Sequence, residues 1–106
     1  MLNLTPHAIV VRGATYQPSG VVCRVTTTAD NREPHDGIPV VNTTYGEVVG
    51  LPGESEVPVL VSVLVLSALA ASGRKLPYRV LCPDTGPDSV IRDDSGKIIG
   101  VKRLME

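Results

Sequence analysis

Residues that could hold a phosphate stand close together in the segment CPDTGPDSVIR, residues 82–92. A proline-flanked turn, Thr85-Gly86, is followed at short range by Ser89 and Arg92. The backbone amides of a turn can bind an anion, and an arginine can add a bidentate contact. Arg92 alternates with Val90 along a predicted strand, so it either faces a ligand or is solvated and paired with one of the aspartates that follow it. Both interpretations stay open.

A predicted helix start offers a second place for an anion. Ser62 is a good N-cap for the helix-forming stretch 63–72, and the first amides of a helix have no partner within it. Arg24 lies on a predicted strand and has the same two alternatives as Arg92. Tyr45 either stacks on a base or packs at the rim of the core. The residues predicted to contact a ligand are Arg92, Arg24, Thr85, Gly86, Ser89, Ser62 and Tyr45.

Side chains that could bind a metal are dispersed along the chain. Each comes from a different segment, and no pair has the spacing of a zinc motif. They are His7, His35, Cys23 and Cys82. The two cysteines are interpreted as buried free thiols. We therefore expect neither a metal nor a cofactor.

Several aspartates crowd the C-terminal third, and paired carboxylates can perform acid–base chemistry. All of them lie in predicted turns or at strand ends, where aspartate is a standard turn residue. They are Asp84, Asp88, Asp93 and Asp94. No nucleophile stands next to a recognisable base, so no catalytic residue is assigned and the chain is predicted not to be an enzyme.

The composition of the chain excludes some classes of binding partner. Ten basic and eleven acidic side chains give a net charge of −1, with no basic stripe and no interleaved aromatics, so neither nucleic acid nor an anionic membrane is expected. The longest apolar run, residues 57–71, is too short to span a bilayer. The N-terminal segment lacks a basic region followed by an apolar one, and a cytoplasmic location is expected.

Prolines and glycines mark the turns between short predicted strands and one helix. The chain is therefore predicted to be a single domain, residues 1–106, of the α+β class. Six to eight short strands would form a curled antiparallel sheet or a partly open barrel, with one buried helix across one face or end. Residues 29–37 are expected to form an exposed loop or hairpin end, and residues 89–104 a closing hairpin. Residues 57–61 are either a strand or the first helical turn. With three tyrosines as the only aromatics, the core must be aliphatic.

Four stretches carry a resemblance over nearly the whole chain: LNLTPHAIVV, TTYGEVVGLP, VSVLVLSALAASGR and VLCPDTGPDSVIRDDSGKIIGVKRL. They resemble a group of small phage and prophage accessory proteins, particularly of actinobacteria. The resemblance implies action in a bacterial host cytoplasm and assigns no catalytic residues. Phage accessory proteins of this size include sponges, which sequester nucleotide-derived immune signals without cleaving them.

Two functions are consistent with these observations. The first is a non-enzymatic, anti-defence protein that binds and sequesters an anionic, nucleotide-derived small molecule as a homo-oligomer. The alternative is a structural or protein-interaction module, such as a small virion component or a protein-binding inhibitor, that uses exposed strand edges and has no small-molecule ligand.

Overall fold

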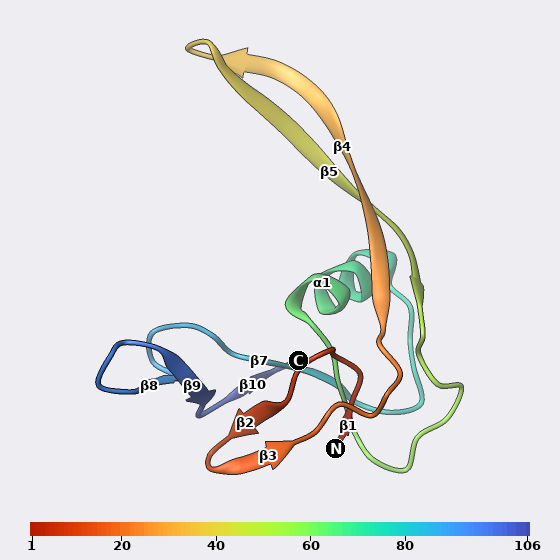
Figure 1. Ribbon diagram of the computed structural model, residues 1–106. Helices are drawn as coiled ribbons and strands as arrows, with labels where there is room; N and C mark the ends of the chain where they lie inside the picture. Colours follow the sequence, from red (N-terminus) through yellow and green to blue (C-terminus); the bar gives the residue numbers. More distant parts are fainter.

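The computed structural model describes residues 1–106 and contains ten strands and one helix (Figure 1). In chain order these are β1 (Leu2–Asn3), β2 (Ile9–Val11), β3 (Ala14–Tyr16), β4 (Arg24–His35), β5 (Ile38–Val49), β6 (Val59–Leu60), α1 (Val63–Ser72), β7 (Val80–Pro83), β8 (Val90–Arg92), β9 (Ile98–Val101) and β10 (Leu104–Met105). The protein is β-rich with a single helix, in agreement with the predicted α+β class. No helix has the length and apolar character needed to cross a bilayer.

The central sheet has the order β1-β6-β7-β10. Strands β1 and β7 both run parallel to β6, while β10 is antiparallel to β7. The helix connects β6 to β7, so this part of the chain is a β-α-β unit. Residues 57–61 therefore include a strand and not the first turn of the helix. The core lies between this sheet and α1, and it is aliphatic as expected.

Helix α1 spans the predicted residues because its ends are set by local signals. The Ser62 hydroxyl accepts a hydrogen bond from the Val65 amide, and Gly73 ends the helix with a φ of 67°. Three of its side chains, Val65, Ala68 and Leu69, are buried in the core cluster. The prediction of one helix packed against a sheet is confirmed, but the helix is not buried on all sides, because six of its ten residues are exposed.

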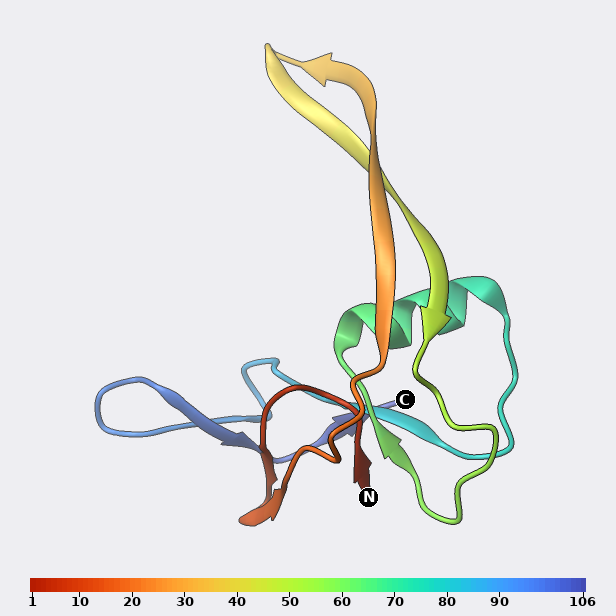
Figure 2. The same ribbon diagram turned by 45° about the vertical axis from the view of Figure 1, so that its right-hand side comes forward.

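A second sheet has the order β3-β2-β9-β8. Strands β8 and β9 form the antiparallel closing hairpin predicted from residues 89–104, and β2 joins β9 in parallel through the pair Val11 and Val101. This sheet lies beside the central one in both views (Figures 1 and 2).

The third sheet is a long two-stranded hairpin, β4–β5, called the arm from here on. It rises far from the rest of the molecule in both views (Figures 1 and 2). Asp36 and Gly37 form its two-residue turn, both with positive φ, which matches the twist of a hairpin. Of its strand residues only Val48, near the base, is buried. The arm raises the radius of gyration to 16.1 Å, against about 13 Å for a compact chain of this length.

Two bulges bend the arm. Near its base, Gly46 and Glu47 of β5 oppose the single residue Thr26 of β4. A side chain at position 46 would collide with the Thr26 hydroxyl, which explains the glycine. Near the tip, the residues between Arg32 and His35 form the second irregularity.

Several expectations about the sheets are wrong. The strands do not form one antiparallel sheet, because β1–β6, β6–β7 and β2–β9 are parallel pairs, and the sheets are open with no barrel. There are ten strands, more than the six to eight expected, and two of them have twelve residues. For residues 29–37, expected to be an exposed loop or a hairpin end, the hairpin end is confirmed: residues 29–35 are exposed strand and the turn follows directly. The loop alternative is wrong, because the polar arm has no buried face to impose alternation on its sequence.

Candidate functional site

A cleft at the base of the arm brings together two of the predicted ligand residues, Arg24 and Ser62. Its cavity volume is about 310 Å³, at the lower end of the range for ligand clefts. Strand β4, the preceding residues and the start of α1 supply its walls. The lining residues are Leu4, Thr5, Pro6, Val22, Cys23, Arg24, Val25, Thr26, Val49, Ser62, Leu64 and Val65.

Arg24 is the one charged residue of this cleft. No carboxylate lies within ion-pair distance of its guanidinium. The start of α1 adds a partial positive charge, and the amides of Val63 and Leu64, in the first turn, have no partner inside the helix. The hydroxyls of Thr26 and Ser62 complete a site that is chemically suited to an anion with an apolar portion, while the Thr5 hydroxyl at its wall already donates to Asn3.

Arg92 lies elsewhere and is already engaged. Its side chain is exposed, and one guanidinium nitrogen donates to the Gly96 carbonyl at 2.6 Å, which closes the β8–β9 hairpin. With Thr85, Pro87 and Val90 it lines a separate hollow of about 350 Å³. Arg92 therefore shares a hollow with Thr85 and not with Arg24 or Ser62.

The turn at 84–89 uses its polar groups internally. The Gly86 amide donates to the Asp84 carboxylate at 2.9 Å, and Arg103 forms an ion pair with the same carboxylate at 2.8 Å. Ser89 is fully buried, and its hydroxyl accepts hydrogen bonds from the Lys102 and Arg103 amides. These contacts describe a structural turn that ties β7 to the β9–β10 connection.

Tyr45 lies in a third place. Together with Thr43, Thr44 and Gly46 it lines a hollow of about 410 Å³ whose opposite wall is formed by Ala68, Ala71 and Ser72 of α1. This hollow between β5 and α1 is called the β5–α1 hollow below. The predicted ligand residues are thus divided among three places.

Three carboxyl groups couple stability to pH. A hydrogen bond from the Gly86 amide, aided by Arg103, lowers the pKa of Asp84. Contacts from Ser95 and the Lys97 amide lower the pKa of Asp93, and Arg79 lowers the pKa of Glu106. Groups whose pKa falls on folding add to the free energy of unfolding above about pH 4, and this contribution is lost as pH drops through the lowered values.

We therefore expect the free energy of unfolding to fall as the pH is lowered below about 4. Asp84→Asn should be less stable than wild type at neutral pH and should approach it in acid, because the neutral amide loses nothing on protonation. Urea unfolding from neutral to acidic pH measures both curves. Parallel curves for the two proteins would contradict this role of Asp84.

The other groups with possible chemistry are dispersed. Cys23 and Cys82 are buried free thiols, and burial raises the pKa of both. His7 is exposed, and His35 lies at the tip of the arm, 3.4 Å from Asp36. A buried thiol with a raised pKa is a poor nucleophile at neutral pH.

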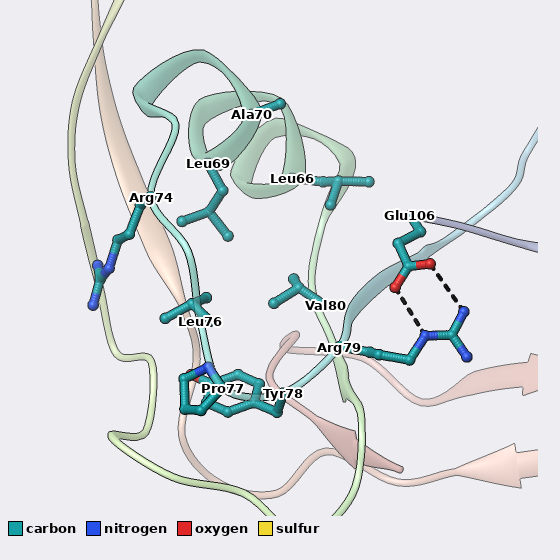
Figure 3. A pocket seen from close by; sticks show the side chains of 10 residues that line it. All are labelled: Leu66, Leu69, Ala70, Arg74, Leu76, Pro77, Tyr78, Arg79, Val80 and Glu106. Atoms are coloured by element: carbon teal, nitrogen blue, oxygen red, sulfur yellow. Dashed lines mark hydrogen bonds and ion pairs between the residues drawn. The ribbon is translucent and has the colours of Figure 1, made fainter.

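The largest cavity was not anticipated from the sequence. It is a groove of about 570 Å³ between α1 and β7, with Leu66, Leu69 and Val80 pointing into it (Figure 3). At its rim the Arg79 guanidinium is bound by both oxygens of Glu106, at 2.8 and 2.9 Å, so this cation is neutralised. The two residues are 27 positions apart, and no sequence signal links them.

Comparison of the chain with protein-family models, with curated proteins and with solved structures found no match in any of the three.

Proposed function

We propose that this protein binds an anionic, nucleotide-derived small molecule without converting it, and that the Arg24 cleft is the binding site. In this proposal it acts as a phage-type accessory protein that sequesters its ligand in the host cytoplasm, as a homo-oligomer. The resemblance of the sequence to phage and prophage accessory proteins supports the biological setting, and the geometry of the cleft supports the chemistry.

The observation that carries the proposal is the unpaired Arg24 guanidinium beside the start of α1. A phosphate would accept hydrogen bonds from the guanidinium, the first-turn amides and the Ser62 hydroxyl. The apolar side chains of Val22 and Leu64 would cover the uncharged part of the ligand. The cleft holds no carboxylate or histidine that could act as a base, which favours binding over turnover.

A thermal-shift panel of nucleotides, cyclic dinucleotides and ADP-ribose derivatives tests the proposal. A ligand at 100 times its Kd should add about 2.7 kcal/mol, or roughly 10 °C in Tm for a domain of this size. Arg24→Ala should abolish the shift while leaving the Tm of the free protein nearly unchanged, because the side chain is exposed and unpaired.

Arg92→Ala is the matched control, since it removes an exposed strand arginine outside the cleft. It should keep the ligand shift. Loss of the shift in Arg92→Ala but not in Arg24→Ala would mean that the ligand binds in the hollow lined by Arg92 and not in the Arg24 cleft. The absence of a shift with every compound of the panel would reject the function. Recovery of the ligand unchanged after incubation would separate binding from catalysis.

A second candidate function, a protein-interaction module, is favoured by the arm. A two-stranded hairpin has marginal stability by itself, and this one leaves nearly all of its strand residues exposed. Such a module would show association without any small molecule and no response to the panel.

A further inference from the structure

The two edges of the arm differ in a way that selects one of them for pairing. Strand β4 carries Asp30, Arg32 and Glu33, and charges of this kind guard an exposed edge against pairing. Strand β5 has no charged residue from Ile38 to Gly46 and is rich in β-branched side chains. Each strand also contains one proline, Pro34 in β4 and Pro39 in β5, so charge is what distinguishes the two edges. An exposed, uncharged strand about 30 Å long is a template for another strand, with one backbone donor missing at Pro39.

The β5 edge also has a hollow and a side chain that matches it. Ile38, at the tip, is 62% exposed, the highest value among the large apolar residues. The β5–α1 hollow, at the base, is lined by residues of β5 and α1 and by none of β4, so it lies on the β5 side of the arm. The opposite wall of this hollow consists of the small residues Ala68, Ala71 and Ser72.

We propose that the β5 edges of two copies of this chain pair antiparallel about a two-fold axis near Asn42. Ile38 and Gly46 lie four positions on either side of Asn42, so this register puts Ile38 of each copy opposite Gly46 of the other. Each tip then fills the β5–α1 hollow of its partner. The two-stranded arms become one four-stranded sheet, which removes the marginal state of an isolated hairpin.

A second copy of the chain pairs with the β5 edge and fills the β5–α1 hollow through the same two-fold axis. Antiparallel pairing of identical strands is isologous, so the same register serves both subunits. The absence of charge on β5 from Ile38 to Gly46 avoids like-charge pairs across the axis, whereas the charged β4 edges would have to face one another in the alternative pairing. The apolar side chains of Ile38, Val40 and Val41 are exposed in the monomer and become partly covered in the dimer.

Cross-linking at matched positions tests the register. Asp30 of β4 and Asn42 of β5 are direct partners across the hairpin, so they stand at the same height on opposite edges. Cα atoms across the axis of an antiparallel pair are about 5 Å apart, which a disulfide can bridge. Mild oxidation should convert Asn42→Cys into a covalent dimer and leave Asp30→Cys monomeric. The native cysteines are buried and give little background.

Sedimentation of the protein without introduced cysteines measures the association itself. The mass should rise from 11.2 kDa towards twice that value over a concentration series that reaches millimolar. Ile38→Lys should weaken dimerisation at least tenfold, because a charge would enter the partner's hollow, whose lining includes no acid to pair with it. His35→Lys, on the strand opposite Ile38, should have little effect.

A monomer at every concentration would overturn the proposal, and so would cross-linking of Asp30→Cys as efficient as that of Asn42→Cys. Equal weakening by Ile38→Lys and His35→Lys would exclude the tip-in-hollow contact. The dimer contact does not involve Arg24, so the two proposals can fail separately. Ligand binding by a monomer would reject this pairing and the homo-oligomeric state but not the anion site, and a dimer with no ligand response would reject the anion function alone.

Discussion

Replacing Asn3 with aspartate is expected to lower the free energy of unfolding by about 3 kcal/mol or more, one of the two largest effects we anticipate for a single change. The Asn3 side chain is 1% exposed, and every one of its polar atoms is used. Its amide nitrogen donates to the His7 and Tyr16 carbonyls at 2.8 and 2.9 Å. Its carbonyl oxygen accepts from the Thr5 amide and hydroxyl.

An aspartate at this position would keep the two contacts from Thr5 but would turn a second oxygen towards two backbone carbonyls. It would also bury a charge with no cation beside it, which is the more costly effect. Urea unfolding at neutral pH measures the loss. Asn31→Asp makes the same chemical change at an exposed position of the arm and should shift the free energy by less than about 0.5 kcal/mol. Equal losses in the two variants would show that Asn3 does not hold this network together.

The second large effect is expected in helix α1. Leu69→Ala should cost about 2–5 kcal/mol, because Leu69 is only 6% exposed and belongs to the core cluster between the helix and the central sheet. The core has few members to share the loss, since only sixteen of the 106 residues are buried.

Leu64→Ala is the matched control within the same helix. Leu64 is 43% exposed, and the substitution changes helix propensity in the same way, so its cost should stay below about 1 kcal/mol. Thermal unfolding monitored at the helical circular dichroism band compares the two variants with wild type. A Leu64→Ala loss as large as that of Leu69→Ala would mean that the helix packs through a different face.

The predictable parts of the fold were those with signals inside a few residues. Ser62 and Gly73 mark the two ends of α1, because an N-cap and a left-handed C-terminal residue are requirements of the local sequence. The β8–β9 hairpin follows from its short turn with Gly96 at positive φ. The parallel pairing of β6 with β1 and β7 has no local signal, since it depends on strands from distant parts of the chain.

The candidate site was predictable only in its residue types. Arg24 and Arg92 look equivalent in the sequence, each on a strand next to apolar neighbours. Their difference arises from tertiary contacts: the Gly96 carbonyl accepts from Arg92, whereas no carboxylate lies within ion-pair distance of Arg24. The start LNLTPH likewise gave no hint that Asn3 and Thr5 are the polar centre of the N-terminal region.

The order of the central sheet has a consequence for the time course of folding. Its neighbouring strands come from residues 2–3, 59–60, 80–83 and 104–105, so β6–β7 and β7–β10 pair residues at least 21 positions apart, and β1–β6 pairs residues 57 positions apart. Loop closure of this kind costs entropy before any contact is gained, and domains dominated by non-local pairing fold in milliseconds to seconds. The two strands of the arm are joined by a two-residue turn, so this hairpin can form within about 10 μs. The β5 edge is therefore formed and exposed for part of the time before the central sheet is complete, because an isolated hairpin is only marginally stable.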